Sequence, residues 1–331
     1  MFIEMKIPLE KLFQKKLIIL TGMLIITASL LLAVYKQSNE GAIASWHMIN
    51  VNAGKLQGDA NLLMIGDQVV MIDAGYAHEA KTVVVPYFQK LDIKQIDHFF
   101  ISHPHRDHYE GLARLLYAGI KIKNLYYKVP DPEIRDCCYN KEHFLKFINY
   151  AKDRGAKLIQ PKSGFRLVLP GGSVLEILHA QEGNLTNAKI DVNDLSLIMK
   201  WSINGSTVLF PGDLNMKVGT VLSSDARMQS EFLKMPHHGL SSIAPNSFFD
   251  RVDPDYVLVP GPAGHWCGER GKRAREWTIE SRKPTWVNGI NGHVEVIFSR
   301  TKTEIIPERV DGKCKLRAFG TVLVSKNKRQ D

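Results

Sequence analysis

Three histidines and an aspartate lie close together in the run 102–108, which reads Ser-His-Pro-His-Arg-Asp-His. The whole chain of 331 residues has only 12 histidines, so composition does not account for this concentration. Imidazole nitrogens and a carboxylate at this spacing are ligands that zinc and similar borderline metals prefer. A plain turn would need none of these side chains. The run therefore predicts a metal site that includes His103, His105, Asp107 and His108.

The segments on either side of this run indicate where the site lies. Residues 96–101 form a short apolar run that is typical of a buried strand, and residues 109–118 have a helical pattern. The metal-binding residues would then occupy the loop at the carboxyl end of a strand, which is where sites of α/β proteins usually lie.

The four candidate ligands of this run could serve two metals but cannot saturate both. In that case other parts of the chain must contribute ligands. Asp213 follows the apolar strand predicted at 206–210, and its carboxylate can bridge two cations, although a simple turn is the alternative there. His237 and His238 precede a glycine, and at least one of them is predicted to be a ligand. The sequence does not choose between them, and we favour His237. His179 ends another predicted strand, where a ligand role and a structural role remain equally open.

The remaining strands are predicted in clusters separated by single helices. This arrangement favours two mixed sheets with helices on the outside over strict alternation of strands and helices. The further predicted strands are 46–51, 60–65, 69–72, 125–129, short strands within 164–178, 195–201, 232–235, 255–259, 294–298 and 302–306, and the further predicted helices are 82–91, 141–154 and 272–282.

The N-terminus has the pattern of a membrane anchor. Lys11, Lys15 and Lys16 precede an uncharged apolar stretch, 17–34, whose length is at the lower limit for one membrane span. The positive flank places the N-terminus in the cytoplasm and the rest of the chain outside. A cleaved signal is the alternative, with a cleavage site at Ala42-Ile43-Ala44. The predicted organisation is a basic segment 1–16, an anchor or signal 17–36, a linker 37–45, a folded domain 46–320 that carries the candidate metal ligands, and a polar tail 321–331.

Export would make the four cysteines candidates for disulfides. Adjacent cysteines rarely bond each other, so we expect a bridge from Cys137 or Cys138 to Cys267 or Cys314.

A formal net charge of +9 favours an anionic partner, although a solvated basic surface would give the same charge. The segment 270–283 is rich in lysine and arginine, with Trp266 and Trp277 available for stacking on a nucleic acid. Interleaved glutamates leave open that this segment is only a charged helix face.

In chain order, these segments resemble the metallo-β-lactamase fold superfamily and, within it, the extracellular metallohydrolase domain of ComEC-type competence proteins. The resemblance covers about residues 46–298. Two departures are a longer opening loop at 50–59 and Leu240 where the family has serine. With one predicted span in place of a many-helix channel, a role in DNA transport is not carried over. The matching motifs are Gly58-Asp59, Ile72-Asp73-Ala74-Gly75, 103–108, Asn193-Asp194-Leu195-Ser196-Leu197, Gly212-Asp213, Pro236-His237-His238-Gly239 and Gly264-His265.

The resemblance implies a four-layer αββα fold and two divalent metal ions, with zinc favoured and manganese as the alternative. His103, His105 and His179 would hold one metal, Asp107, His108 and His237 the other, and Asp213 would bridge them. Asp73 would orient a ligand histidine. Asp107 would take part in catalysis, and His238 or His265 would donate a proton or hold a phosphate. A hydroxide between the metals would be the nucleophile.

The function expected on these grounds is that of an exported, membrane-tethered phosphodiesterase or nuclease. A cell-envelope phosphoesterase of the teichoic-acid type is the alternative, followed by a lactam or thioester hydrolase. A non-enzymatic binding module is the least favoured reading, because no ligand is lost.

Overall fold

The computed structural model describes residues 44–52, 56–130, 136, 138–180, 191–241, 243–310, 314 and 320–325. All of them belong to one unit of the chain, residues 42–331. The predicted anchor lies outside the described residues, and so does Cys137. Among the described helices, none is long and apolar enough to cross a membrane.

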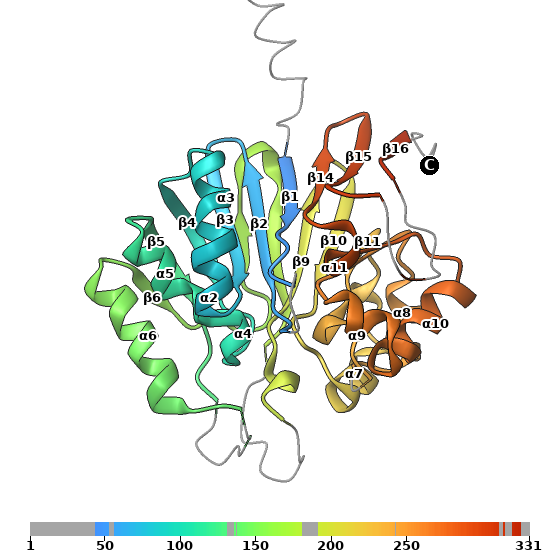
Figure 1. The fold of residues 1–331 in the computed structure, drawn as a ribbon, viewed down its shortest axis with the longest axis horizontal. Coiled ribbons are helices and arrows are strands. Elements are labelled where there is room, and N and C mark those ends of the chain that lie inside the picture. Colours follow the sequence, from blue (N-terminus) through green and yellow to red (C-terminus); the bar gives the residue numbers. More distant parts are fainter. Residues whose placement is uncertain are drawn as a thin grey trace, which may run out of the picture. The chain divides into compact units, whose positions relative to one another are not determined.

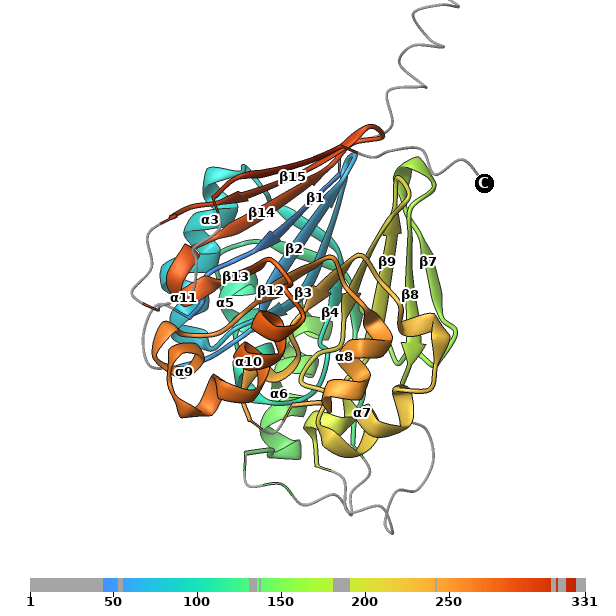
Figure 2. The ribbon, with the colours of Figure 1, turned by 90° about the vertical axis from the view of Figure 1, so that its right-hand side faces the viewer.

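Two sheets face each other, and helices cover the outer side of each (Figures 1 and 2). The first sheet has the strand order β16-β15-β14-β1-β2-β3-β4-β5-β6, and the second has the order β13-β12-β11-β10-β9-β8-β7. Both sheets mix parallel and antiparallel pairs, as predicted. The first comprises β1 (Ala44–Met48), β2 (Ala60–Ile65), β3 (Gln68–Ala74), β4 (Gln95–Phe100), β5 (Lys121–Tyr126), β6 (Lys157–Ile159), β14 (Val294–Phe298), β15 (Lys302–Pro307) and β16 (Val322–Ser325). The second comprises β7 (Arg166–Val168), β8 (Val174–His179), β9 (Ile198–Ile203), β10 (Ser206–Phe210), β11 (Phe232–Lys234), β12 (Tyr256–Val259) and β13 (Thr285–Val287).

The helices pack in two groups, one on each sheet. On the first sheet lie α2 (Ala77–Glu79), a π-helical turn η1 (Ala80–Val84), α3 (Val85–Lys90), α4 (Arg106–Tyr109), α5 (Gly111–Tyr117) and α6 (Lys141–Asp153). On the second lie α7 (Met216–Leu222), α8 (Asn246–Val252), α9 (Ala263–Cys267) and α10 (Lys272–Glu280), with α11 (Asn288–Asn291) following β13. Helix α6 shows why such segments form: the Asn140 side chain caps its N-terminus through the His143 amide, and Phe144, Ile148 and Ala151 form one buried face.

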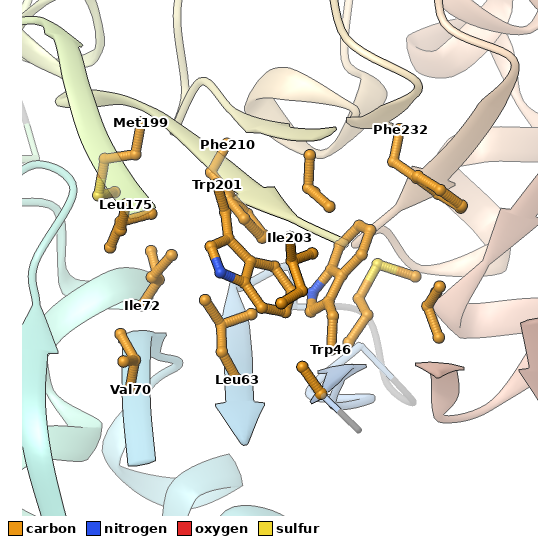
Figure 3. Packing of buried hydrophobic residues seen from close by; sticks show 14 of the residues in the cluster. Trp46, Leu63, Val70, Ile72, Leu175, Met199, Trp201, Ile203, Phe210 and Phe232 are labelled. Atoms are coloured by element: carbon orange, nitrogen blue, oxygen red, sulfur yellow. The ribbon is translucent and has the colours of Figure 1, made fainter. Parts of the chain in front are cut away.

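The core between the sheets is aromatic. Trp46 of β1 and Trp201 of β9 are fully buried, and the Trp46 ring lies edge-on to Phe210 of β10 at 5.1 Å between centroids. Figure 3 shows these rings interleaved with aliphatic side chains of both sheets. The indole N–H of Trp46 donates to Asn61 Oδ1 at 3.0 Å, so its one polar atom is satisfied. This packing holds the carboxyl ends of strands from both sheets in fixed positions.

The predicted strands fall in the two sheets, although most bounds shift by one to three residues. The helix predicted at 82–91 starts earlier, at Ala77. Strand β16 pairs with β15, so the sheet extends past residue 320 into the predicted polar tail. The prediction that Cys137 or Cys138 is bonded to Cys267 or Cys314 is wrong, because Cys267 and Cys314 are bonded to each other.

Candidate metal centre

The histidine-rich loop follows β4, as expected, but Asp107 and His108 already lie in the short helix α4, ahead of the helix predicted at 109–118. Its close approach to β3 depends on Gly111, because a Cβ there would lie 2.1 Å from the carbonyl oxygen of Ala74. The Gly111 amide donates to Gly75 O, and the Asp59 amide donates to Asp107 O. These bonds pin the loop against the ends of β2 and β3.

His103 and His105 present one ring nitrogen each to the same point. His103 Nε2 lies 3.1 Å from His105 Nδ1. Two nitrogen ligands of one tetrahedral metal, each about 2.05 Å from it, would lie about 3.3 Å apart. The other nitrogen of His105, Nε2, lies 3.3 Å from Asp136 Oδ1. Although burial opposes it, this contact raises the pKa of His105, and it lowers the pKa of Asp136 to about 2. Asp136 is thus a carboxylate that orients a candidate ligand, and the sequence analysis did not single it out.

A second group of four buried side chains converges beside the first. His108 Nε2 lies 3.2 Å and His238 Nε2 lies 3.1 Å from Asp213 Oδ2, and His238 Nε2 is also 3.3 Å from Asp107 Oδ2. One ligand atom from each of these four residues lies within 4.8 Å of the others. Asp213 Oδ2 is also 3.9 Å from His103 Nε2, so its carboxylate lies between the two groups.

The two adjacent histidines take different positions. Both have left-handed backbone angles, with φ of 44° at His237 and 55° at His238, so their rings diverge. His238 is fully buried in the second group, and its Nδ1 donates to Pro260 O at 3.0 Å. His237 Nδ1 lies 2.8 Å from Asn215 Oδ1, and its Nε2 is 4.0 Å from Asp213 Oδ2. Of the pair, the structure therefore brings His238 into the ligand cluster and leaves His237 at its edge.

Asp73 supports the second group in the way expected of an orienting residue. Its Oδ2 lies 2.8 Å from His108 Nδ1 and accepts from Ser102 Oγ at 2.7 Å, while Oδ1 accepts from the Ser102 amide. The Asp73 carboxylate makes Nδ1 of His108 a donor, which leaves Nε2 as the nitrogen that would bind a metal.

A buried ion pair that the sequence analysis missed lies behind the cluster. The Lys234 ammonium contacts Asp59 and donates to Gly212 O at 2.8 Å, and both side chains are only 1% exposed. Lys234 Nζ is also 3.8 Å from Asp213 Oδ1, and Asp59 Oδ1 is 3.6 Å from His238 Nδ1. This pair fixes the turn that carries Asp213.

Several ligand-type atoms in this region are buried without a hydrogen bond among the described residues: His108 Nε2, His238 Nε2 and Asp213 Oδ1. Burial alone would raise the pKa of Asp213, but His238 and His108 hold it well below its usual range. Buried acceptors left unpaired are costly unless something fills the space between them. This donor set of imidazole and carboxylate fits a divalent cation.

The other two predicted site residues lie away from these groups. His179 ends β8 opposite Ile198, and neither ligand cluster among the described residues includes it. His265 lies on α9, where its Nε2 accepts from Arg270 at 3.1 Å.

A cavity of about 860 Å³ opens beside the ligand groups. Three tyrosines and several carboxylates form much of its wall, and Arg106, which is ion-paired with Glu110, is the one arginine or lysine among the described lining residues. The lining residues are Gln57, Tyr76, His105, Arg106, Asp107, Tyr109, Asp136, Cys138, Tyr139, Asn140, His143, Asp191, Asn193, Asp213 and His237.

Part of the basic segment secures the fold, whereas Arg270, Lys272 and Arg282 are exposed. The guanidinium of Arg273 donates to the carbonyls of Ile243 and Ala244, and that of Arg275 donates to Gly268 O, so both side chains secure loops. Trp266 is fully buried and Trp277 is 4% exposed. The prediction that these tryptophans are available for stacking is therefore wrong, because both pack into the core beneath the helices.

Comparison with known proteins supports the class that the fold and site define. The model of the metallo-β-lactamase superfamily matches residues 53–132, which include the histidine-rich loop. The crystal structure of the metallo-β-lactamase fold protein YhfI from Bacillus subtilis superposes with a TM-score of 0.50 at 14% identity, over 74% of this chain and 96% of that one. At this identity the likeness concerns the fold alone.

Two proteins with names that refer to competence are similar to this chain in sequence. The chain is 24% identical to competence protein ComA of Neisseria gonorrhoeae and 25% identical to ComE operon protein 3 of Bacillus subtilis, over 67% and 73% of its length. It spans only 27% and 31% of those proteins. The resemblance recognised in the sequence, to the metallo-β-lactamase superfamily and to competence proteins within it, is confirmed. The fold and the buried cluster indicate a metal-dependent hydrolase.

Proposed function

We propose that the chain is a dinuclear metal-dependent phosphodiesterase, exported and tethered to the membrane by its N-terminal segment. The observation that carries the proposal is the pair of adjacent ligand groups that share Asp213 at the wall of a large cavity. One group consists of His103 and His105. The other consists of Asp107, His108 and His238, with His238 in the ligand role that the sequence analysis gave to His237.

Two divalent ions bound there, zinc or manganese, would lower the pKa of a water and stabilise the charge that develops on a phosphoryl group. The protein orients their ligands through Asp73, Asp136 and Pro260, each of which receives or faces the outer nitrogen of a ligand histidine. These contacts keep the inner nitrogens free to bind.

His237 is the side chain placed to handle the leaving group. It lines the cavity, and its Nδ1 faces the Asn215 oxygen because the Asn215 amide nitrogen donates to Asp191 Oδ2 at 2.8 Å. Nδ1 must then be the donor, which leaves Nε2 of the neutral ring as an acceptor. Nε2 would take the proton that the attacking water gives up and pass it to the leaving oxygen, which would complete hydrolysis. His265, the other candidate donor, is not among the lining residues described.

As the substrate, the cavity wall favours a small phosphodiester of the cell envelope over a nucleic acid. Asp136 and Asp191 face the cavity in addition to the ligand carboxylates. This negative wall would repel a polyanion, whereas it would not repel the alcohol group of a phosphodiester when that group is cationic or neutral. The three tyrosines offer rings and hydroxyls to such a group.

The experiment uses the full-length chain with Asp107→Ala beside it. Metal content is measured after dialysis, and hydrolysis of bis-p-nitrophenyl phosphate is followed with added zinc or manganese. Asp67→Ala, at an exposed aspartate, is the matched control. Two ions per chain, with turnover that is lost only in Asp107→Ala, are expected. Two ions without turnover on any phosphodiester, including DNA and p-nitrophenyl phosphorylcholine, would refute the proposed function.

A further inference from the structure

We propose that the side-chain oxygen of Asn193 is a protein ligand of the metal held by His103 and His105, in the place first assigned to His179. The inference rests on the metal centre of the proposed function but not on its substrate.

Asn193 has a buried acceptor without a partner. It is 8% exposed, lines the same cavity as His105, and its Oδ1 makes no hydrogen bond to any described residue. Among the described residues, the buried side-chain atoms without a hydrogen bond also include His108 Nε2, His238 Nε2 and Asp213 Oδ1. Gln68 Oε1, Ser206 Oγ and Thr303 Oγ1 are also unpaired but do not line the cavity, whereas Asn193 and Asp213 both line it. An amide oxygen buried in this way requires a donor or a cation.

The backbone holds Asn193 beside the bridging aspartate. It begins the 3-10 turn η3 (Asn193–Leu195). The Ser196 hydroxyl donates to Asn193 O at 2.7 Å and accepts from the Asp213 amide at 2.9 Å. One residue further on, the Leu197 amide donates to Ser102 O in the metal loop at 2.9 Å. Asn193 is therefore joined through short bonds to both segments that carry ligands.

No described residue donates to Oδ1. Two carboxylates that only accept, Asp107 and Asp213, line the same cavity as Asn193, and the Nδ1 proton of His237 goes to Asn215. A cation is a partner that suits an unpaired oxygen in a cavity lined by carboxylates. Amide oxygens bind divalent metals, and an ion held by His103, His105 and Asp213 can take a further protein ligand beside a water when it is five-coordinate.

The test measures binding of Co²⁺, a zinc substitute with a visible spectrum, to the full-length chain by competition with a chelator. The variants are Asn193→Leu, which removes the oxygen at nearly equal volume, Asn193→Asp, which keeps an oxygen, and His179→Ala. Circular dichroism checks folding. We expect Asn193→Leu to weaken one of the two Co²⁺ ions by at least about tenfold and to change the visible bands. Asn193→Asp should bind both ions with altered bands, and His179→Ala should match the wild type.

Wild-type affinity and spectrum in Asn193→Leu would overturn the inference, as would weakened binding in His179→Ala. If the leucine variant does not fold, Asn193→Asp decides, because an unchanged spectrum there would mean that residue 193 does not touch the metal. None of these readouts uses phosphodiester hydrolysis. A wild-type chain that binds two ions without turnover would refute the proposed function and leave this inference intact.

Discussion

His238 Nδ1 lies 3.0 Å from the carbonyl oxygen of Pro260, and this contact turns the opposite ring nitrogen toward Asp213 and Asp107. The left-handed backbone at His237 and His238 separates the two rings that the sequence presents side by side. One ring faces the ligand cluster and the other faces the cavity. Their different surroundings predict different effects of substitution.

His238→Ala is expected to lose one bound metal and to lower turnover by at least about 100-fold, because a ligand disappears. His237→Ala should keep both metals and lower kcat by about 100-fold, because only proton transfer is impaired. Metal analysis of the two purified variants, together with kcat, separates the roles. Loss of metal from His237→Ala but not from His238→Ala would reverse the assignment.

Asp73→Asn is expected to weaken metal binding by about 10- to 100-fold, because the carboxylate that orients His108 becomes an amide. Chelator competition measures the affinity. Asp67→Asn, in an exposed turn, is the matched control and should bind as the wild type does. An unchanged affinity in Asp73→Asn would mean that Ser102 alone positions the loop.

Lys234→Met is expected to lower the free energy of unfolding by about 3–5 kcal/mol, because it leaves the Asp59 carboxylate buried without its partner. Urea denaturation of the full-length chain measures this loss. Adding Asp59→Leu to the variant should restore part of it, since no uncompensated charge then remains. A double variant less stable than Lys234→Met would contradict this account.

Stability should also depend on pH through His47. Burial, followed by nearby His293, lowers the pKa of His47 to about 4, although its ring contacts Tyr87 and Ser45 and lies 3.9 Å from Glu295. The unfolded chain, with a pKa of about 6.5, binds more protons than the native chain between these values. The neutral ring's contribution is therefore complete above about pH 7 and declines as pH falls toward 4, by about 3 kcal/mol.

The measurement is the free energy of unfolding between pH 7 and pH 4. In His47→Gln this fall should be smaller, whereas His78→Gln, at an exposed histidine, should follow the wild type. Identical slopes in His47→Gln and the wild type would show that His47 titrates normally in the native chain.

The metal loop could be predicted because its candidate ligands lie within six residues of the sequence. They therefore stay close together in space whatever the rest of the fold is. The choice between His237 and His238 depends on two backbone angles, which residue types do not reveal. Asp136 lies next to a cysteine pair with no recognisable spacing to the histidines, so only the folded chain connects it to His105. Lys234 looks like the polar end of an apolar strand, and its burial appears only when Asp59 lies opposite it.

The sheets were predictable where strands alternate or run apolar, as at β2 and β10. β13 has three residues, too few for a pattern, and β16 gains its structure from pairing with β15. The contacts of the arginines in the basic helix could not be predicted for a different reason. Arginines that bind backbone carbonyls and arginines that face solvent have the same appearance in a sequence.

The candidate ligands come from both sheets: the loop 103–108 follows β4 of the first, whereas Asp213 and His238 follow β10 and β11 of the second. A cation bound to both sets would be a further cross-link between two halves that are already joined by side-chain packing and by contacts such as the Lys234–Asp59 ion pair. Loading the centre would then make the two halves unfold as one cooperative unit, and stripping it would let amide hydrogens near β10 and β11 exchange before those of the first sheet. The bound ions would thus also control whether the two sheets separate.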